Sequence, residues 1–206
     1  IIPQKPVAKI KKILITGGSQ GAADLNDLYL EIIKEPFFKN IKITLSTGPK
    51  NFEEIQKKGR KTDKIEPFIS DMPEALLSHN LILCRSGSGS VYETVWSGRP
   101  AVFFPFPHAT GNHQALNAKA VAGEKINNYK VVDIRPFDAD LAKWELVHFI
   151  EQLNKKPPSG ESNSIKNNGN RQLRKMNPEE RSPGLPVDAH KEMIRLLIEN
   201  ITKKIL

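Results

Sequence analysis

The chain has 206 residues, of which 38% are hydrophobic and 26% are charged, and this size and composition are typical of one globular domain with a polar appendage. It carries 31 lysine and arginine residues against 23 aspartate and glutamate residues, a formal net charge of +8. The sequence has no run of about 18 apolar residues, which excludes a membrane-spanning helix. The single cysteine, Cys84, excludes a disulfide framework and a multi-cysteine metal site. The first residues lack the apolar core of a secretory signal, so a reducing, cytosolic setting is expected.

Six short apolar runs, bounded by glycine, proline, asparagine or charged residues, predict buried strands. They cover residues 12–16, 41–45, 64–68, 81–84, 101–104 and 131–134. The amphipathic stretches that follow them predict helices at about 21–34, 51–59, 73–79, 89–97, 113–123 and 138–153. This alternation predicts an α/β fold with a Rossmann-like, doubly wound parallel sheet, in which every strand-to-helix loop lies at one edge.

The expected Rossmann-like domain extends over residues 1–154, and the pattern changes after it. Residues 155–186 are rich in proline, asparagine and serine and predict a disordered or loop insertion. Residues 187–206 regain an apolar stripe of helical period, which predicts a helix that docks onto another surface. Residues 155–206 hold 11 basic and 6 acidic side chains. This charge is compatible with an anionic membrane or nucleic acid, but a solvated linker and helix surface is the favoured interpretation.

A glycine-rich turn, Gly-Gly-Ser-Gln-Gly-Ala at residues 17–22, directly follows the first predicted strand. Glycines at a strand-to-helix turn allow close approach of a ligand, and the N–H groups of the new helix attract anions. Ser19 adds a hydroxyl donor. Because the turn is not GxGxxG and no acidic residue follows the next strand, a dinucleotide site is disfavoured. The turn on its own slightly favours phosphate binding over a purely geometric role for the glycines.

A second turn of the same kind, Arg-Ser-Gly-Ser-Gly-Ser at residues 85–90, follows the strand at 81–84. Glu93 stands about one turn into the next helix, where a carboxylate can accept hydrogen bonds from paired ribose hydroxyls. Its alternative role is that of an ordinary acidic side chain near a helix N-terminus. Two glycine-rich turns at one sheet edge fit a ligand with a diphosphate better than one turn does.

A third polar cluster, at residues 105–118, joins a proline-bracketed strand end to the start of a helix. Gln114 and Asn117 share a helix face and suit amide contacts to sugar hydroxyls. His108 and His113 lie nearby, but no carboxylate or cysteine completes a ligand set, so neither a metal nor another cofactor is expected.

In chain order, the segments ILITGGSQGA, PFISDM, RSGSGSVYE, SGRPAVFFPFP and HQALNA resemble the C-terminal half of the MurG family, over about residues 10–153. The resemblance implies an inverting glycosyltransferase that moves N-acetylglucosamine from UDP-N-acetylglucosamine to lipid I, giving lipid II in peptidoglycan synthesis. It also implies GT-B architecture, in which the C-terminal domain binds the UDP-sugar and the N-terminal domain binds the lipid acceptor. The helix at 187–206 is then expected to pack back towards the N-terminal domain.

The resemblance further implies roles for single residues. It places the diphosphate at residues 17–21, uracil against the backbone of Phe68 and Ile69 with Met72 beside them, and the ribose hydroxyls on Glu93. His113 and Gln114 occupy the sugar-contacting pair. The candidate substrate-binding residues are Gly18, Ser19, Gln20, Gly21, Phe68, Ile69, Met72, Arg85, Ser86, Gly87, Ser88, Gly89, Ser90, Glu93, His113, Gln114 and Asn117.

The family's N-terminal domain, with its proposed base histidine, has no counterpart in the sequence. We therefore expect an isolated donor-binding domain without its own catalytic base, either a truncated enzyme or the donor subunit of a split one. The resemblance also implies peripheral association with the cytoplasmic face of the bacterial inner membrane. Another GT-B enzyme of UDP-sugars, such as a glycolipid glycosyltransferase or an epimerase, is the alternative. Nucleic-acid binding is disfavoured because no recognisable module accompanies the basic residues.

Overall fold

The computed structural model describes residues 9–107, 109–122 and 128–155. His108, the insertion predicted at 155–186 and the helix predicted at 187–206 lie outside the described residues, except for Lys155, which ends the last described helix.

Within the described residues, six parallel strands form one sheet in the order β3-β2-β1-β4-β5-β6. The strands are β1 (Lys12–Thr16), β2 (Lys42–Ser46), β3 (Lys64–Glu66), β4 (Leu81–Cys84), β5 (Ala101–Phe103) and β6 (Tyr129–Val131). The helices are α1 (Ala23–Ile32), α2 (Phe52–Lys58), α3 (Met72–Ser78), α4 (Ser88–Ser97), α5 (His113–Val121) and α6 (Ala139–Lys155). Short 3-10 helices lie at η1 (Pro36–Phe38), η2 (Pro49–Asn51) and η3 (Thr110–Asn112). The predicted Rossmann-like fold is confirmed.

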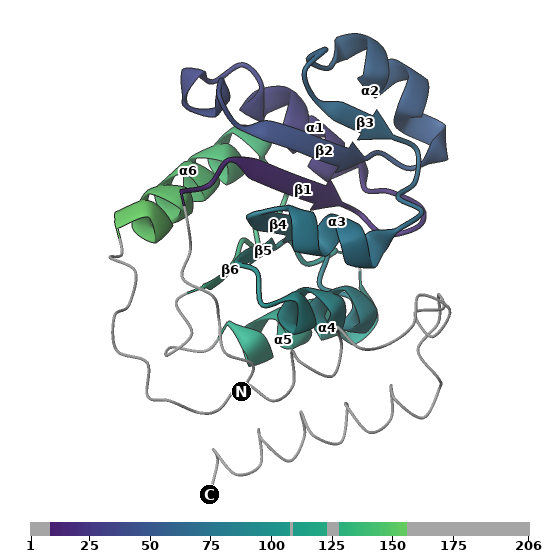
Figure 1. Ribbon diagram of the computed structural model, residues 1–206. Coiled ribbons are helices and arrows are strands. Elements are labelled where there is room, and N and C mark those ends of the chain that lie inside the picture. The colour runs from purple at the N-terminus through teal and green to yellow at the C-terminus, as the bar shows by residue number, and fades with distance from the viewer. Residues whose placement is uncertain (1–8, 108, 123–127, 156–206) are drawn as a thin grey trace, which may run out of the picture. The chain divides into compact units, whose positions relative to one another are not determined.

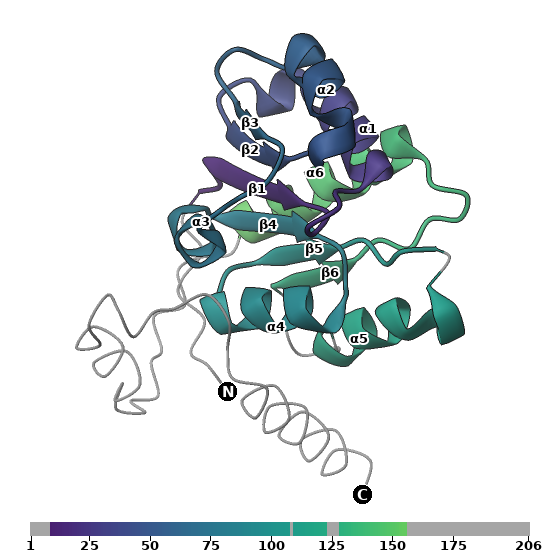
Figure 2. The same cartoon turned by 90° about the vertical axis from the view of Figure 1, so that its right-hand side faces the viewer.

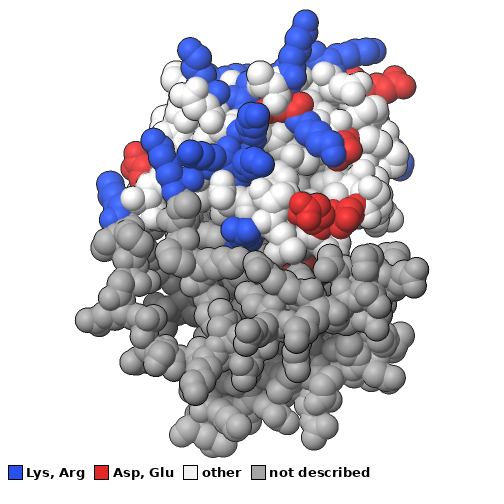
Figure 3. Space-filling model, viewed as in Figure 1, with Lys and Arg blue, Asp and Glu red and all other residues white. Residues whose placement is uncertain are grey.

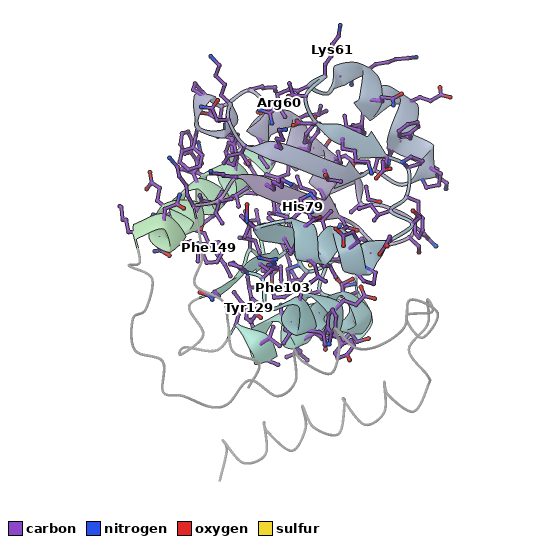
Figure 4. All side chains as sticks on the ribbon, viewed as in Figure 1. Arg60, Lys61, His79, Phe103, Tyr129 and Phe149 are labelled. Atoms are coloured by element: carbon purple, nitrogen blue, oxygen red, sulfur yellow. The ribbon has the colours of Figure 1, made fainter. Side chains whose placement is uncertain are left out.

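Four strands differ from their predicted bounds: β2 lies one residue later, β5 ends one residue earlier, and β3 and β6 differ by two residues or more. β3 ends at Glu66 instead of residue 68, because Pro67 has no N–H to donate to the ladder. β6 begins at Tyr129 instead of residue 131, since its register pairs Tyr129 with Ala101 of β5. The ring of Tyr129 lies 5.9 Å from that of Phe103 on the neighbouring strand (Figure 4). This aromatic contact, which the apolar run at 131–134 does not indicate, joins the start of β6 to β5.

Alternate residues of each central strand face opposite layers of helices (Figure 1 and Figure 2). Ile13 and Ile15 of β1 pack in a core with residues of α1 and α6, while Leu14 between them packs with residues of α3, α4 and α5. The same alternation holds in β4, where Leu83 joins the first core and Ile82 the second. Burial on both faces explains why these strands are continuous apolar runs.

The strand order reverses between β1 and β4. From β1 the chain adds β2 and β3 on one side, then crosses to β4 and adds β5 and β6 on the other. The helix that follows β1 packs with one core and the helix that follows β4 packs with the other. The loops after β1 and β4 therefore diverge at the carboxyl edge of the sheet, the place where open α/β sheets bind ligands.

Candidate functional site

The first glycine turn leaves the start of α1 without a capping side chain. Within the turn, the Gly21 N–H donates to the Gly18 carbonyl at 3.1 Å, and the Gly18 N–H lies 3.3 Å from Thr16 Oγ1. Ala22 occupies the N-cap position and has no hydroxyl or carboxylate to accept from the helix. Ser19 and Gln20 are exposed at the tip of the turn. This arrangement presents the N–H groups of a helix start to an anion.

The first turn lies directly against the loop that follows β2, with no side chain between them. A methyl group added to Gly21 would lie 2.2 Å from the Thr47 carbonyl oxygen, and one added to Gly48 would lie 2.2 Å from the Gln20 carbonyl oxygen. Both glycines also have positive φ, 75° at Gly21 and 77° at Gly48. The buried Asn26 of α1 donates to the same Thr47 carbonyl at 3.1 Å. The position of the first turn is therefore fixed by backbone packing.

The second glycine turn repeats this pattern at β4. α4 begins at Ser88, one residue before the predicted start, and its N-cap is Gly87, which has no side chain to cap the helix. A methyl group added at Gly87 or Gly89 would meet no atom of another segment within 4 Å, so both positions face open space. Ser86 is fully buried, and its Oγ has no hydrogen-bond partner among the described residues. The second turn thus places another uncapped helix start at the same edge.

Arg85 connects the second turn to the start of α1, which directly follows the first turn. Its Nη2 lies 2.5 Å from Oδ1 of Asp24 in the first turn of α1, and the two side chains are only 11% and 15% exposed. Its Nη1 lies 3.3 Å from the Phe104 carbonyl and 3.4 Å from the Pro105 carbonyl. The guanidinium also stands 5.2 Å from the centre of the Phe106 ring. Arg85, a predicted substrate-binding residue, therefore makes these contacts inside the protein.

Asp24 is a residue of this site that sequence reasoning missed. The available signal was an acidic residue in the first turn of the helix after a glycine turn, a place where it competes with a bound anion for the helix N-terminus.

The predicted sugar-contacting amides of α5 also brace neighbouring loops. Oε1 of Gln114 accepts a hydrogen bond from the Phe106 N–H at 3.0 Å, and Nδ2 of Asn117 donates to the Ser86 carbonyl at 3.1 Å. The first of these contacts holds the loop after β5, and the second holds the loop after β4. His113 begins α5 and is exposed. The structure thus brings these three residues to the same edge as the second glycine turn.

The predicted uracil segment follows β3 and leads into α3. Phe68 is 55% exposed, whereas Ile69 is buried in the core beneath α3 and α4, so only the backbone of Ile69 can meet a ligand. Asp71 caps α3 by accepting from the Glu74 N–H at 2.9 Å, and Met72 begins the helix. The cap fixes the path of the backbone in front of the helix.

Cys84 and Glu93 lie just before and just after the second turn. Glu93 lies on the exposed side of α4. Cys84, the last residue of β4, is buried, and burial raises the pKa of its thiol to about 12. Its Sγ lies 3.6 Å from Thr94 Oγ1. Because the thiolate is the reactive form, Cys84 is a structural residue and not a nucleophile.

The described residues contain no group of three or more histidine, cysteine, aspartate or glutamate side chains that could hold a metal ion. No helix among residues 9–155, the undescribed gaps aside, is both long and apolar enough to cross a bilayer. A depression of about 540 Å³ lies elsewhere, and it is lined by Asp27, Leu30, Glu31, Ile33, Lys34, Lys58 and Ala139. None of the predicted donor-binding residues lines it.

Known enzymes resemble this chain in sequence. UDP-N-acetylglucosamine–N-acetylmuramyl-(pentapeptide) pyrophosphoryl-undecaprenol N-acetylglucosamine transferase from Solibacter usitatus is 39% identical over 127 residues, covering 58% of this chain and 35% of that protein. The enzyme of the same name from Bacillus cytotoxicus is 31% identical over 148 residues, covering 69% of this chain and 39% of that protein. The chain therefore spans between a third and two fifths of the length of these relatives.

Solved structures and a family model agree with these relatives. The crystal structure of Acinetobacter baumannii MurG superimposes with a TM-score of 0.60 at 30% identity, covering 73% of this chain and 43% of that one. The glycotransferase of kitacinnamycin has a TM-score of 0.53 at 16% identity, covering 73% of this chain and 40% of that one, which shows a shared fold. The model of the glycosyltransferase family 28 C-terminal domain matches residues 12–176, from the start of β1 past the end of α6. This chain therefore belongs to the glycosyltransferase family 28 C-terminal domain family.

Proposed function

We propose that the chain is the donor-binding domain of an inverting glycosyltransferase that moves N-acetylglucosamine from UDP-N-acetylglucosamine to lipid I. The observation that carries the proposal is the pair of uncapped helix starts, α1 and α4, at the point where the strand order reverses. Each follows a glycine turn, and together they offer two sets of N–H donors to one diphosphate. The names of the relatives above support the choice of sugar and acceptor.

In the reaction, the acceptor hydroxyl attacks the anomeric carbon of the sugar while the bond to the β-phosphate of UDP breaks. The hydroxyl proton passes to a base, which we expect in the N-terminal domain. Negative charge grows on the departing diphosphate, and the helix starts of α1 and α4 stabilise it together with the hydroxyls of Ser19 and Ser88. This chain's contribution is donor binding and stabilisation of the leaving group.

The internal contacts of the α5 amides determine what they can offer a sugar. Gln114 uses its carbonyl oxygen to hold the Phe106 N–H, so its NH₂ group is the part that can donate to a sugar hydroxyl. Asn117 uses its NH₂ group to hold the Ser86 carbonyl, so its carbonyl oxygen can accept from one. A donor and an acceptor on one helix face suit neighbouring hydroxyls, each of which both donates and accepts.

The nucleoside part would bind on the α3 and α4 side. The backbone before α3, at Phe68 and Ile69, would pair with the uracil edge, and Glu93 would accept hydrogen bonds from the ribose hydroxyls. Phe68 offers an apolar ring to the base.

Isothermal titration calorimetry with UDP tests this assignment. Glu93→Ala should weaken binding by about 1–3 kcal/mol, since hydrogen bonds to a charged carboxylate are lost. Glu151→Ala, which removes an exposed carboxylate from α6, is the matched control and should bind as the unchanged chain does. Absence of UDP binding by the unchanged chain would refute the proposal, and unaltered affinity in Glu93→Ala would remove Glu93 from the site. Competition by other UDP-sugars measures the donor preference.

The acceptor named for the relatives carries undecaprenol, a lipid, so the complete enzyme would act at a membrane surface. We place the chain, through its acceptor domain, at the cytoplasmic face of the bacterial inner membrane as a peripheral protein. Co-sedimentation of the complete enzyme with anionic vesicles is the expected result. Its recovery wholly in the supernatant would contradict this placement.

A further inference from the structure

Arg85 occupies a central position among the loops of the candidate site. It leaves the end of β4, and its side chain reaches Asp24, a residue 61 positions earlier, across the point where the strand order reverses. Its second terminal nitrogen lies near two carbonyl oxygens of the loop after β5, and the guanidinium stands over the Phe106 ring. One side chain therefore joins the start of α1 to the loops that follow β4 and β5.

Asp24 lies where a carboxylate works against a bound diphosphate. It belongs to the first turn of α1, whose N–H groups are those that the proposed function assigns to the phosphates. Two negative groups at one helix N-terminus repel each other and compete for the same donors. Since the Asp24 side chain is only 15% exposed, water and salt would screen this repulsion weakly.

The guanidinium of Arg85 removes that conflict. At 2.5 Å it pairs directly with Asp24, and no other ion pair is recorded for Asp24 in the described part of the chain. Its remaining contacts are with carbonyl oxygens and an aromatic face, which use its donors and its flat surface inside the protein. All of these contacts of Arg85 are with atoms of the protein itself.

We propose that Arg85 is a positioning residue that neutralises Asp24 and locks the two glycine turns together, and that it does not itself bind the donor. This inference rests on the proposed donor-binding function and replaces the sequence-based expectation of a substrate contact. It implies that the carboxylate of Asp24 becomes a repulsive charge when Arg85 is lost, and that removing this carboxylate then restores binding.

A double-mutant cycle tests the proposal with UDP and with uridine, which lacks the diphosphate. Arg85→Gln should weaken UDP binding about tenfold or more, equal to about 1.4 kcal/mol. Uridine affinity, measured by NMR titration, should stay the same, because the proposed function assigns the nucleoside to α4 and the backbone before α3 and not to α1. In the Arg85→Gln background, Asp24→Asn should recover most of the lost UDP affinity. Lys130→Gln, which breaks the ion pair to Glu145 on β6 and α6, is the matched control and should bind UDP as the unchanged chain does.

The possible outcomes separate the alternatives. If Asp24→Asn fails to rescue the Arg85→Gln variant while uridine still binds, Arg85 contacts the diphosphate directly and the proposal is wrong. If UDP and uridine affinity fall together, Arg85 supports the whole fold and the proposal is also wrong. Thermal unfolding of each variant identifies any that are not folded. If Arg85→Gln is not folded, Arg85→Lys replaces it and tests the geometry with the charge retained. Failure of the unchanged chain to bind UDP would refute the donor-binding function instead.

Discussion

His79 is a buried titratable side chain at the end of α3, and both of its ring nitrogens have partners (Figure 4). Nδ1 lies 2.6 Å from the Ala75 carbonyl, to which it donates, so Nε2 accepts from the Thr44 hydroxyl at 2.9 Å. Burial lowers the pKa of His79, and the positive charges of nearby lysine and arginine side chains lower it further, while the hydrogen bond to Ala75 acts in the opposite direction. The folded protein therefore holds this imidazole neutral.

We predict that His79 makes the protein less stable in mild acid. The pKa is lowered in the folded state from 6.5, so below that pH the unfolded chain binds a proton that the folded chain does not. The free energy of unfolding should be constant above pH 6.5 and should fall as the pH drops from 6.5 towards the lowered pKa of the folded state. Urea unfolding at a series of pH values should show a flatter profile in His79→Gln.

The exposed His148, whose Nε2 contacts Gln152 on α6, supplies the control for this prediction. His148→Gln should retain the pH profile of the unchanged chain. If His79→Gln also retained it, the titrating group would be a different one.

At the scale of elements, the sequence predicts those strands whose ends are marked by the residues themselves. β1 and β4 have the predicted bounds, because a buried apolar run stops at glycine or a charged residue in each. β6 could not be located in this way, since its bounds depend on which residues pair with β5. Strand pairing is a property of the assembled sheet.

In the candidate site, too, the sequence predicts the features that local residues determine and not those that depend on how the elements assemble. Glycine turns after strands predict its backbone, because close packing and uncapped helix starts follow from local sequence. The contact between Arg85 and Asp24 could not be predicted, because it joins distant residues that meet only through the order of the strands. The internal contacts of Gln114 and Asn117 likewise depend on where α5 packs.

Lysine and arginine side chains gather on the face of the molecule shown in Figure 3. Two of the lysines, Lys12 and Lys42, begin β1 and β2, at the edge opposite the candidate site. Lys12 and Lys42 are exposed neighbours in the parallel register of these strands. Like charges side by side on a sheet are destabilising, and threonine suits a strand better than lysine does. The charges of Lys12 and Lys42 therefore repel each other at this edge of the sheet.

We predict that Lys42→Thr raises the free energy of unfolding by about 0.2–1 kcal/mol. Lys42→Arg keeps the charge and should show no gain. Urea unfolding at low and high salt measures both, and the gain of Lys42→Thr should shrink at high salt, because salt screens the repulsion that it removes. A gain of equal size in Lys42→Arg would show that charge is not the cause.

For the whole molecule, the described residues would account for the donor side of the transfer reaction that we propose. The loops after β1, β3, β4 and β5 supply the groups that we assign to the diphosphate, nucleoside and sugar, and the acceptor and base are assigned to a second domain. Catalysis of group transfer requires the attacking oxygen, the base and the anomeric carbon to be held together, and such positioning is worth about 7–11 kcal/mol. This chain should therefore bind the sugar donor without catalysing the transfer.

We predict that the 206-residue chain binds UDP-N-acetylglucosamine but transfers no sugar to a lipid I analogue. Adding a separately expressed acceptor domain should restore transfer at least in part, because it completes the site. The measurement is incorporation of radiolabelled sugar into the lipid. Efficient transfer by the chain alone would show that it already contains an acceptor site and a base.

The contact between Gly21 and Gly48 has a practical use as a spectroscopic reporter. The two loops meet backbone to backbone, so a displacement of the first turn should also shift the loop after β2, to which we assign no part of the donor. The amide resonance of an isotopically labelled Gly48 would then respond to occupancy of the neighbouring turn without being perturbed by direct contact. Such a signal would distinguish ligands that engage the diphosphate position from those that bind through the nucleoside alone.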